Sequence, residues 1–280
     1  MKYYLSIDAG TSVIKTVIFS QDFKMKFKSS IENKVQTNSK GKSEINMNSF
    51  WSLTSKLVKN SLKKSKIKNI NIIGVGITGN MVGVWPVNTK GKSVRNAILW
   101  NDARSKEIFD KIQINNPNIY QNIFDLTGSI VQFGCTIPVI KWLEKNEPQT
   151  IKKTDYFLTC KDWIRLNLTN EFNNDHTERA VAPGDIKKAD LSLKIFKLLK
   201  LNKKYLNKFP QVKKSQDIAG YITDKAAKEI AEVKDKVARK EAALEQAAGE
   251  VKRLVRLACG DADLGAKMVD MIATECPQFV

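Results

Sequence analysis

The chain has 280 residues, a hydrophobic content of 42% and a formal net charge of +18. A chain of this length and composition can bury a core, which excludes an intrinsically disordered protein. It has no run of about 18 apolar residues, so no membrane-spanning helix is expected. Strand-like residues begin directly at the N-terminus, without the apolar segment of a signal peptide. We therefore expect a cytoplasmic protein whose four cysteines are reduced.

The positive charge comes mainly from lysine, with 40 Lys against 7 Arg. Proteins that bind nucleic acids usually depend on arginine for bidentate contacts. The densest lysine cluster, at residues 56–68, falls on the polar face of a predicted amphipathic helix. The composition therefore indicates a lysine-rich surface and speaks against nucleic acid as a partner.

The first twenty residues predict two strands, over residues 3–7 and 13–20, because both segments are rich in β-branched and aromatic residues. Asp8-Ala9-Gly10-Thr11-Ser12 lies between them. Backbone amides at a glycine turn can bind an anion, and a carboxylate beside them can hold a magnesium ion. The pentapeptide alone leaves two interpretations open: a phosphate-binding loop or an ordinary hairpin turn.

The rest of residues 1–228 predicts a mixed α/β fold. Strands are expected over residues 24–29, 70–76, 82–87 and 97–100, and helices over residues 49–64, 103–113, 137–145 and 160–167. Asn48 is expected to cap the first helix, and a turn at residues 89–92 to join the last two strands.

The composition changes near residue 229. Residues 1–228 contain 22 Asn and 9 Ala, whereas residues 229–280 contain no Asn and 10 Ala. A helix is predicted to begin at Thr223 or Asp224, and apolar residues then repeat every seven positions from Ile230 to Ala258. We therefore expect a second unit, a helical hairpin over residues 229–280, with self-association through residues 226–258.

Two further segments carry a resemblance. Residues 76–83 read Gly-Ile-Thr-Gly-Asn-Met-Val-Gly, and residues 97–104 read Ala-Ile-Leu-Trp-Asn-Asp-Ala-Arg. They resemble the FGGY carbohydrate kinases, the family of xylulokinase and glycerol kinase. In that family a G-[IV]-[ST]-G-Q-x-x-G turn lines the sugar site and a hairpin leads to A-I-L-W-x-D-x-R. Val82 stands where xylulokinases carry His and glycerol kinase carries Glu, so that polar sugar contact is lost or supplied elsewhere.

A third segment, Asn-Asn-Asp-His-Thr-Glu-Arg-Ala at residues 173–180, is similar to the family's T-D-x-T-x-A-S motif. The resemblance implies that Asp175 is the general base that takes the proton of the attacking sugar hydroxyl. It also implies ATP and Mg²⁺ as cofactors, and these further roles: catalysis and metal binding for Asp8; phosphate binding for Gly10, Thr11 and Ser12; sugar binding for Asn80, Met81, Asn101, Asp102 and Arg104.

Over residues 1–228 the resemblance implies a ribonuclease H-like N-terminal domain of the actin/hexokinase superfamily, with a mixed sheet flanked by helices. The implied activity is ATP-dependent phosphorylation of a small sugar or polyol. The family's second domain, which holds adenosine, has no counterpart in residues 229–280, so a truncated kinase is expected. The alternative is a non-catalytic remnant or fusion that acts as a sugar-binding or helical interaction module.

Overall fold

The computed structural model of the protein describes residues 1–230. One end of the molecule is built on a four-stranded sheet, whose strand order is β3-β2-β1-β6. Pairing is antiparallel between β1 and β2 and between β2 and β3, and parallel between β1 and β6, so the predicted mixed sheet is confirmed. The strands are β1 (Tyr3–Ala9), β2 (Val13–Ser20), β3 (Met25–Glu32) and β6 (Ile72–Gly79).

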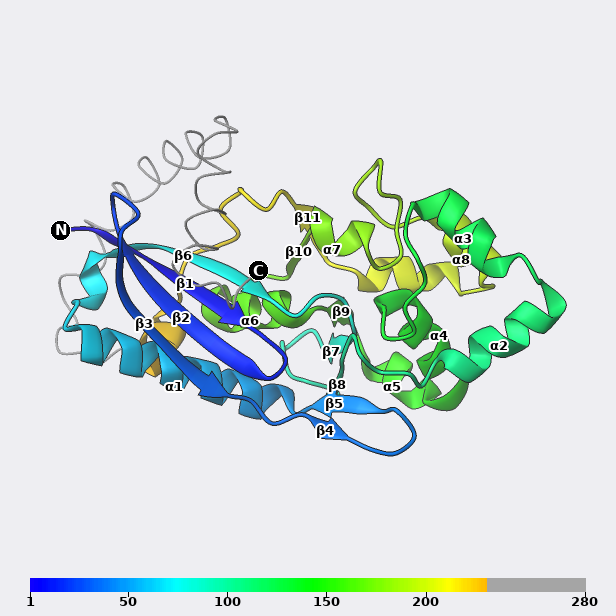
Figure 1. The fold of residues 1–280 in the computed structure, drawn as a ribbon, viewed down its shortest axis with the longest axis horizontal. Coiled ribbons are helices and arrows are strands. Elements are labelled where there is room, and N and C mark those ends of the chain that lie inside the picture. Colours follow the sequence, from blue (N-terminus) through cyan, green and yellow to red (C-terminus); the bar gives the residue numbers. More distant parts are fainter. Residues whose placement is uncertain (231–280) are drawn as a thin grey trace.

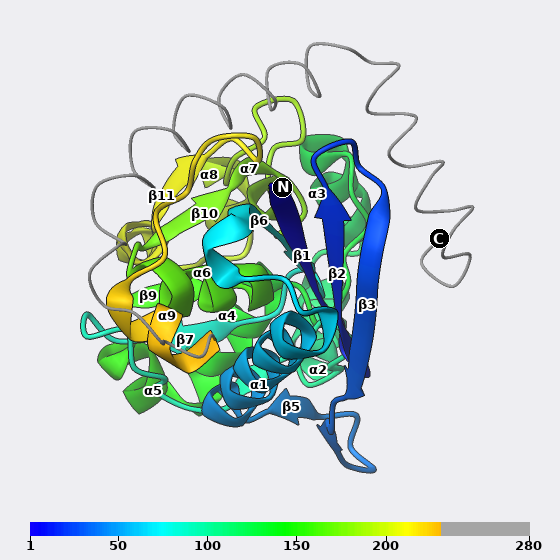
Figure 2. The same cartoon turned by 90° about the vertical axis from the view of Figure 1, so that its left-hand side faces the viewer.

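Helix α1 (Met47–Ser65) covers one face of this sheet. Figure 2 shows α1, α6 (Cys160–Thr169) and α9 (Asp224–Ile230) on the same side of the strands. The hydroxyls of Thr16 on β2 and Ser61 on α1 are 2.6 Å apart in this buried interface. The predicted cap at Asn48 is wrong: Asn46 caps α1, accepting from the Ser49 N–H at 2.9 Å, because the extended backbone ends at Asn46.

Short strands connect the two ends of the molecule (Figure 1). They are β4 (Gln36–Thr37), β5 (Ser43–Ile45), β7 (Trp85–Val87), β8 (Ala97–Ile98) and β9 (Tyr156–Leu158). The predicted hairpin of residues 82–87 and 97–100 is present only as two isolated antiparallel bridges, Val84 with Ile98 and Val87 with Ser93, around the predicted turn at residues 89–92. Each strand pairs with a more distant segment instead, β7 with β9 and β8 with β5.

The far end of the molecule is helical (Figure 1). It comprises α2 (Lys106–Asn115), α3 (Ile119–Thr127), α4 (Thr136–Asn146), α5 (Pro148–Lys153), α8 (Leu193–Leu198) and a 3₁₀ helix, η2 (Lys203–Lys208). These helices enclose a second core that includes Phe109, Ile140 and Phe196. The predicted helices over 103–113 and 137–145 correspond to α2 and α4, whereas α3 and α5 were not predicted.

The remaining described elements are a short 3₁₀ turn (Asn69–Asn71), β10 (Asn173–Asp175), α7 (His176–Ala180), β11 (Gln211–Lys213) and α9. The Thr223 hydroxyl accepts from the Ala226 N–H at 3.2 Å, which agrees with the predicted helix start. The heptad repeat and the second helix of the predicted hairpin lie outside the described residues.

Within residues 1–230, no helix combines the length and apolarity needed to cross a membrane.

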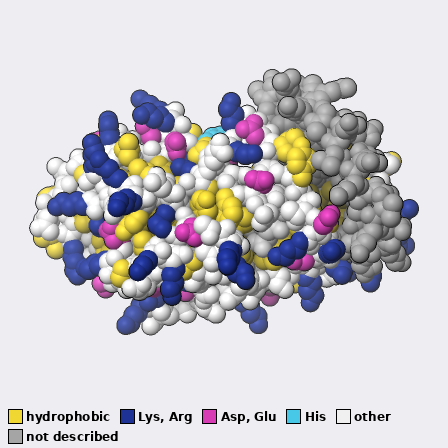
Figure 3. All heavy atoms as spheres, turned by 180° about the vertical axis from the view of Figure 1, so that it is seen from behind, with side chains coloured by type: hydrophobic (Ala, Val, Ile, Leu, Met, Phe, Trp, Pro, Cys, Tyr) yellow, Lys and Arg dark blue, Asp and Glu magenta, His cyan; other side chains and the backbone are white. Residues whose placement is uncertain are grey.

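Basic side chains are scattered over the surface. Figure 3 shows lysine and arginine distributed across the described part of one face, with acidic and hydrophobic side chains between them. This arrangement matches the lysine-rich surface expected from the sequence.

Candidate active site

The loop after β1 is a tight turn fastened to the end of β3. Asn33 donates its side-chain amide to the Thr11 carbonyl at 2.7 Å and its backbone N–H to the Ser12 carbonyl at 2.8 Å. Gly10 has no room for a side chain, because a Cβ there would lie 2.5 Å from the carbonyl oxygen of Val13. The sequence therefore places a glycine where the backbone requires one.

Asp8 lies near the end of β1, opposite Lys15 on β2 and Thr78 on β6. Partial burial raises the pKa of its carboxyl, and the charge of Lys15 acts in the opposite direction. No cluster of three or more His, Cys, Asp or Glu side chains that could hold a metal occurs in residues 1–230. One carboxylate is nevertheless sufficient for Mg²⁺ carried by phosphates, because this ion keeps several waters. Asp8 therefore fits a nucleotide-borne ion and not a site made of protein ligands alone.

The turn that follows β6 is fastened to the same place. Asn80 donates both its backbone N–H, at 3.0 Å, and its side-chain amide, at 3.1 Å, to the carbonyl of Ala9. Met81 is exposed, while Val82 is buried with φ of +50° and Gly83 has φ of +71°. Two successive left-handed residues turn the chain sharply away from the sheet edge.

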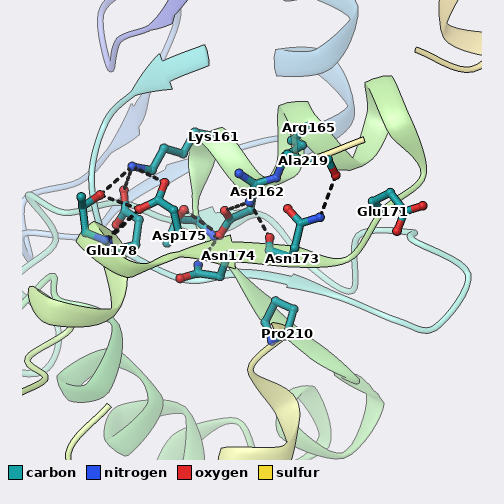
Figure 4. Close-up of polar contacts among 12 residues, drawn as sticks. Lys161, Asp162, Arg165, Glu171, Asn173, Asn174, Asp175, Glu178, Pro210 and Ala219 are labelled. Carbon is teal, nitrogen blue, oxygen red and sulfur yellow. Dashed lines mark hydrogen bonds and ion pairs between the residues drawn. The ribbon is translucent and has the colours of Figure 1, made fainter. Parts of the chain in front are cut away.

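Asp175 ends β10 and caps α7 (Figure 4). Its Oδ1 accepts from the Thr177 N–H at 3.0 Å, the Thr177 hydroxyl at 2.5 Å and the Glu178 N–H at 3.2 Å. Its Oδ2 lies 2.8 Å from Nζ of Lys161. Burial acts to raise the pKa of Asp175, but Lys161 and the Thr177 hydroxyl outweigh it and lower that pKa. Asp175 is thus an ionised carboxylate at neutral pH.

Glu178 is a second buried carboxylate beside Asp175. Its Oε2 accepts the Val82 N–H at 2.8 Å, and its Oε1 lies 3.4 Å from Nζ of Lys161. Burial raises the pKa of Glu178 to about 7; Lys161 lowers it, and the negative charge of Asp162 raises it further. This carboxyl changes its charge near neutral pH.

The segment that carries Asp175 is fixed to α6 by a buried polar network (Figure 4). Asp162 closes a capping box with Thr159 at the start of α6. Its Oδ2 also accepts from the side-chain amide of Asn174 at 2.5 Å, and Arg165 pairs with its other oxygen. Because Asn174 immediately precedes Asp175, this network sets the position of the carboxylate relative to Lys161.

Hydrogen bonds join three of the predicted motifs, which are far apart in the sequence: residues 8–12, 76–83 and 173–180. The Ala9 carbonyl accepts from Asn80 and contacts Sγ of Cys160 at 3.5 Å, so the β1 loop, the β6 turn and the start of α6 meet at one point. The bond from the Val82 N–H to Glu178 adds the start of α7. The structure thus brings Asp8, the turn after β6 and Asp175 together at the end of the sheet where the parallel strands β1 and β6 finish.

The predicted sugar-binding residues separate into two groups. On the turn after β6, Met81 is exposed and Asn80 is partly buried; Asn101, which follows Trp100 in the chain, is exposed. Trp100 donates its Nε1–H to the Thr11 hydroxyl at 2.9 Å while 45% of the residue stays exposed. These residues lie beside the loop that follows β1.

Asp102 and Arg104 form the other group, in which both side chains are buried and their predicted sugar contact stays a prediction. Arg104 donates to both oxygens of Asp102 at 2.8 Å, and their side chains are 1% and 0% exposed. Arg104 also pairs with Glu44 at 2.6 Å, and the Ser43 N–H donates to Asp102 at 2.6 Å. Nη1 of Arg104 is buried without a hydrogen-bond partner among the described residues, whereas its Nε and Nη2 are bonded inside the protein, so the pair supports the segment that carries Trp100.

Lys161 and Glu178 contact Asp175 but do not belong to the residues predicted from the sequence. Glu178 had a local signal, because an acid three residues after an N-cap residue is typical of a capping box. Lys161 had no such signal, since it lies on α6 while Asp175 ends β10, and the two meet only through the tertiary fold.

Known proteins resemble this chain over the region that contains the site. The sequence profile of the FGGY family of carbohydrate kinases, N-terminal domain, matches residues 3–237. The probable L-xylulose kinase of Haemophilus influenzae is 26% identical over 230 residues, which are 82% of this chain and 47% of that protein. The xylulose kinase of Bacillus subtilis is 29% identical over 180 residues, 64% of this chain and 36% of that protein. The chain spans about half the length of the curated relatives it matches.

Solved structures show the same fold. Gluconate kinase from Lactobacillus acidophilus superposes with a TM-score of 0.73 at 19% identity, over 82% of this chain and 45% of that one. Plasmodium falciparum glycerol kinase with ADP gives a TM-score of 0.73 at 21% identity, over 82% and 46%. The predicted actin/hexokinase-like fold is thereby confirmed. Because the family profile covers most of the sequence, the chain belongs to the FGGY family of carbohydrate kinases and carries the N-terminal domain of that family.

Proposed function

We propose that this chain is the N-terminal part of an ATP-dependent carbohydrate kinase that phosphorylates a hydroxyl of a small sugar or polyol. The observation that carries the proposal is the surroundings of Asp175. One of its oxygens accepts three hydrogen bonds and the other contacts Lys161, at the edge of the sheet where the β1 loop and the β6 turn meet. A base must be held in this way to meet a bound substrate in a fixed geometry.

In the proposed reaction Oδ2 of Asp175 takes the proton of the acceptor hydroxyl. The sugar oxygen bonds to the γ-phosphorus, the bond from that phosphorus to the bridging oxygen breaks, and ADP leaves. Oδ2 suits this role because Lys161 is its single described partner, whereas Oδ1 already has three. A positioned general base contributes a factor of roughly 10² to 10⁴ in rate.

The proposed phosphate site is the loop of Gly10, Thr11 and Ser12, with Asp8 as the magnesium-binding and catalytic carboxylate. Asn33 engages the carbonyls of Thr11 and Ser12, so the loop is rigid where phosphates would approach. When bound, Mg²⁺ would neutralise charge on the phosphates. A polar loop with a glycine at its tightest point suits an anionic ligand.

The proposed sugar contacts are Asn80, Met81, Asn101 and Trp100. The names of the relatives, xylulose kinase, gluconate kinase and glycerol kinase, support a small polyhydroxylated substrate. An exposed indole beside amide side chains offers an apolar face together with hydrogen-bonding groups, which suits a sugar.

A coupled assay of ATP turnover with pentoses, ketoses and polyols tests the proposal, with calorimetry on the same compounds. We expect one substrate to turn over, and Asp175→Asn to reduce kcat by at least about a hundredfold. Asp110→Asn is the matched control, because Asp110 is an exposed carboxylate paired with Lys106 on α2. Full turnover by the Asp175→Asn protein would reject Asp175 as the base.

The second candidate function is sugar binding or helical interaction without catalysis. A flat turnover panel with sugar binding retained in calorimetry would support it and reject catalysis by this chain. A cytoplasmic location and self-association through residues 226–258 stay predictions from the sequence.

A further inference from the structure

The indole of Trp100 is held at its nitrogen by the loop that follows β1. Its Nε1–H donates to the Thr11 hydroxyl at 2.9 Å, and the two residues are 89 positions apart in the sequence. Trp100 nevertheless stays 45% exposed, so the bond fixes one end of the ring and leaves part of its surface open to a ligand. This hydrogen bond joins a proposed sugar contact to the proposed phosphate loop.

The backbones on both sides of this bond are fixed by other contacts. On the loop, the side-chain amide of Asn33 donates to the Thr11 carbonyl at 2.7 Å. On the other segment, Gly134 packs so closely against Trp100 that a Cβ at Gly134 would lie 1.9 Å from the Trp100 carbonyl oxygen. Because both backbones are held, a change at one of these segments reaches the other directly through the indole and the hydroxyl.

The direction of the bond determines what the Thr11 hydroxyl can still do. An indole nitrogen is only a donor, so Oγ1 of Thr11 accepts and keeps its own proton for a second bond. Among residues 1–230 the structure gives that proton no acceptor. A phosphate oxygen is an acceptor, and hydrogen bonds in a chain polarise and strengthen one another. The hydroxyl is therefore prepared to donate to an anionic ligand while the indole donates to it.

We propose that Trp100 and Thr11 form a positioning pair that couples the sugar site to the phosphate site. The indole N–H orients the Thr11 hydroxyl so that its proton meets a phosphate oxygen of the nucleotide. The bound phosphate in turn fixes the ring on which the sugar packs. The proposal rests on the proposed function for the identity of the two ligands, and it is independent of which group accepts the proton of the sugar.

Such a coupling is reciprocal, because each ligand changes the affinity for the other by the same factor. One hydrogen bond sets its size, which is roughly twofold to tenfold in affinity. The nucleotide should therefore tighten sugar binding, although the two ligands contact different residues of the pair.

The first test measures MgATP binding without sugar, by NMR titration of the full chain. It compares the unmodified protein with Trp100→Phe, Thr11→Val and the double variant. Phenylalanine keeps an aromatic ring without an N–H, and valine keeps the shape of threonine without a hydroxyl. We expect Trp100→Phe to weaken MgATP binding by about threefold, and to have no further effect when residue 11 is already valine. Thr11→Ser keeps the hydroxyl and should keep the affinity.

Trp51→Phe is the matched control, since the Trp51 Nε1–H also donates to a side-chain oxygen, Oε2 of Glu229, at 2.6 Å. It should leave MgATP binding unchanged. If Trp100→Phe has no effect on MgATP binding, or the same effect in both Thr11 backgrounds, the indole does not act through the hydroxyl and the proposal is overturned.

The second test follows the indole N–H signal of Trp100 in ¹⁵N spectra of the full chain. We expect MgATP to shift this signal in the unmodified and Thr11→Ser proteins, and to leave it unmoved in Thr11→Val. Binding of MgATP without a shift of the indole signal would overturn the coupling while the phosphate site stands. Absence of MgATP binding to the unmodified chain would reject the proposed phosphate site, and the coupling with it.

The third test measures sugar binding by calorimetry, with and without the magnesium complex of β,γ-imido-ATP, which does not transfer its phosphoryl group. The ligand is the compound that binds most tightly among pentoses, ketoses and polyols. We expect it to bind about threefold more tightly with the nucleotide, and this gain to disappear in Thr11→Val. Sugar binding without the gain would reject the coupling alone, whereas a panel in which no compound binds would reject the proposed sugar site as well.

Discussion

Asn80 donates two hydrogen bonds to one acceptor, the carbonyl of Ala9, at 3.0 Å through its backbone and at 3.1 Å through its side chain. These two hydrogen bonds join the turn after β6 to the loop after β1. The proposed sugar site and the proposed phosphate site therefore share one fixed point.

Asn80→Ala removes one of these two bonds. We expect the free energy of unfolding to fall by about 1 kcal/mol, because the backbone bond remains. Sugar affinity should fall more clearly, since the amide is also a proposed sugar contact. Urea denaturation and calorimetry measure the two effects. Asn146→Ala is the control, because Asn146 also donates to a backbone carbonyl, that of Trp142, on α4. Equal sugar affinity in the unmodified and Asn80→Ala proteins would contradict the assignment.

Gly10→Ala should disturb the loop that follows β1. The new Cβ would lie 2.5 Å from the backbone oxygen of Val13, so the backbone must move. We expect a loss of stability of about 1 to 3 kcal/mol in urea and weaker binding of MgATP in calorimetry. Gly76→Ala is the control, because a Cβ at Gly76 meets no heavy atom within 4 Å. If the two variants behave alike, the loop does not require a glycine.

Arg104→Met should leave the Asp102 carboxylate buried without its cation. Removal of one partner from a buried pair costs about 3 to 5 kcal/mol, so a large drop in the midpoint of urea denaturation is expected. Lys106→Met is the control, because the pair of Lys106 with Asp110 is 57% and 45% exposed and contributes little. A small effect of Arg104→Met would show that the pair is not important for stability.

The raised pKa of Glu178, about 7 in place of 4.5, makes stability depend on pH. The folded protein keeps this proton at a pH where the unfolded chain has released it. The contribution is complete below the unfolded pKa and is lost as pH rises to the folded pKa. Between about pH 5.5 and 7 we expect the contribution of this group to the free energy of unfolding to fall by on the order of 2 kcal/mol.

Urea denaturation across this pH range in the unmodified chain, Glu178→Gln and Glu144→Gln measures that contribution. The slope should be reduced in Glu178→Gln and retained in Glu144→Gln. An identical slope in the Glu178→Gln protein would show that Glu178 does not release its proton in this range. Asp175 does not contribute here, because its pKa is lowered and its effect falls at more acidic pH.

The sequence by itself determined the features that depend on local pattern. The strands on both sides of residues 8–12, the mixed sheet, α4, α6 and the family followed from β-branched runs, helical periodicity and three motifs. These signals are local because strand alternation and turn glycines act on adjacent residues. The cap of α1 was misplaced by two residues, since Asn46 and Asn48 are chemically equivalent caps and the extended backbone selects between them.

Only the tertiary structure decided which groups surround Asp175 and which polar residues are buried. Lys161 and Glu178 reach it from different elements, and Asp102 and Arg104, polar and close to a predicted site in sequence, neutralise each other inside the protein. The partners of β7 and β8 were also set at long range. The physical reason is that burial, ion pairing and pKa depend on groups brought together by packing, and the order of residues along the chain does not encode those distances locally.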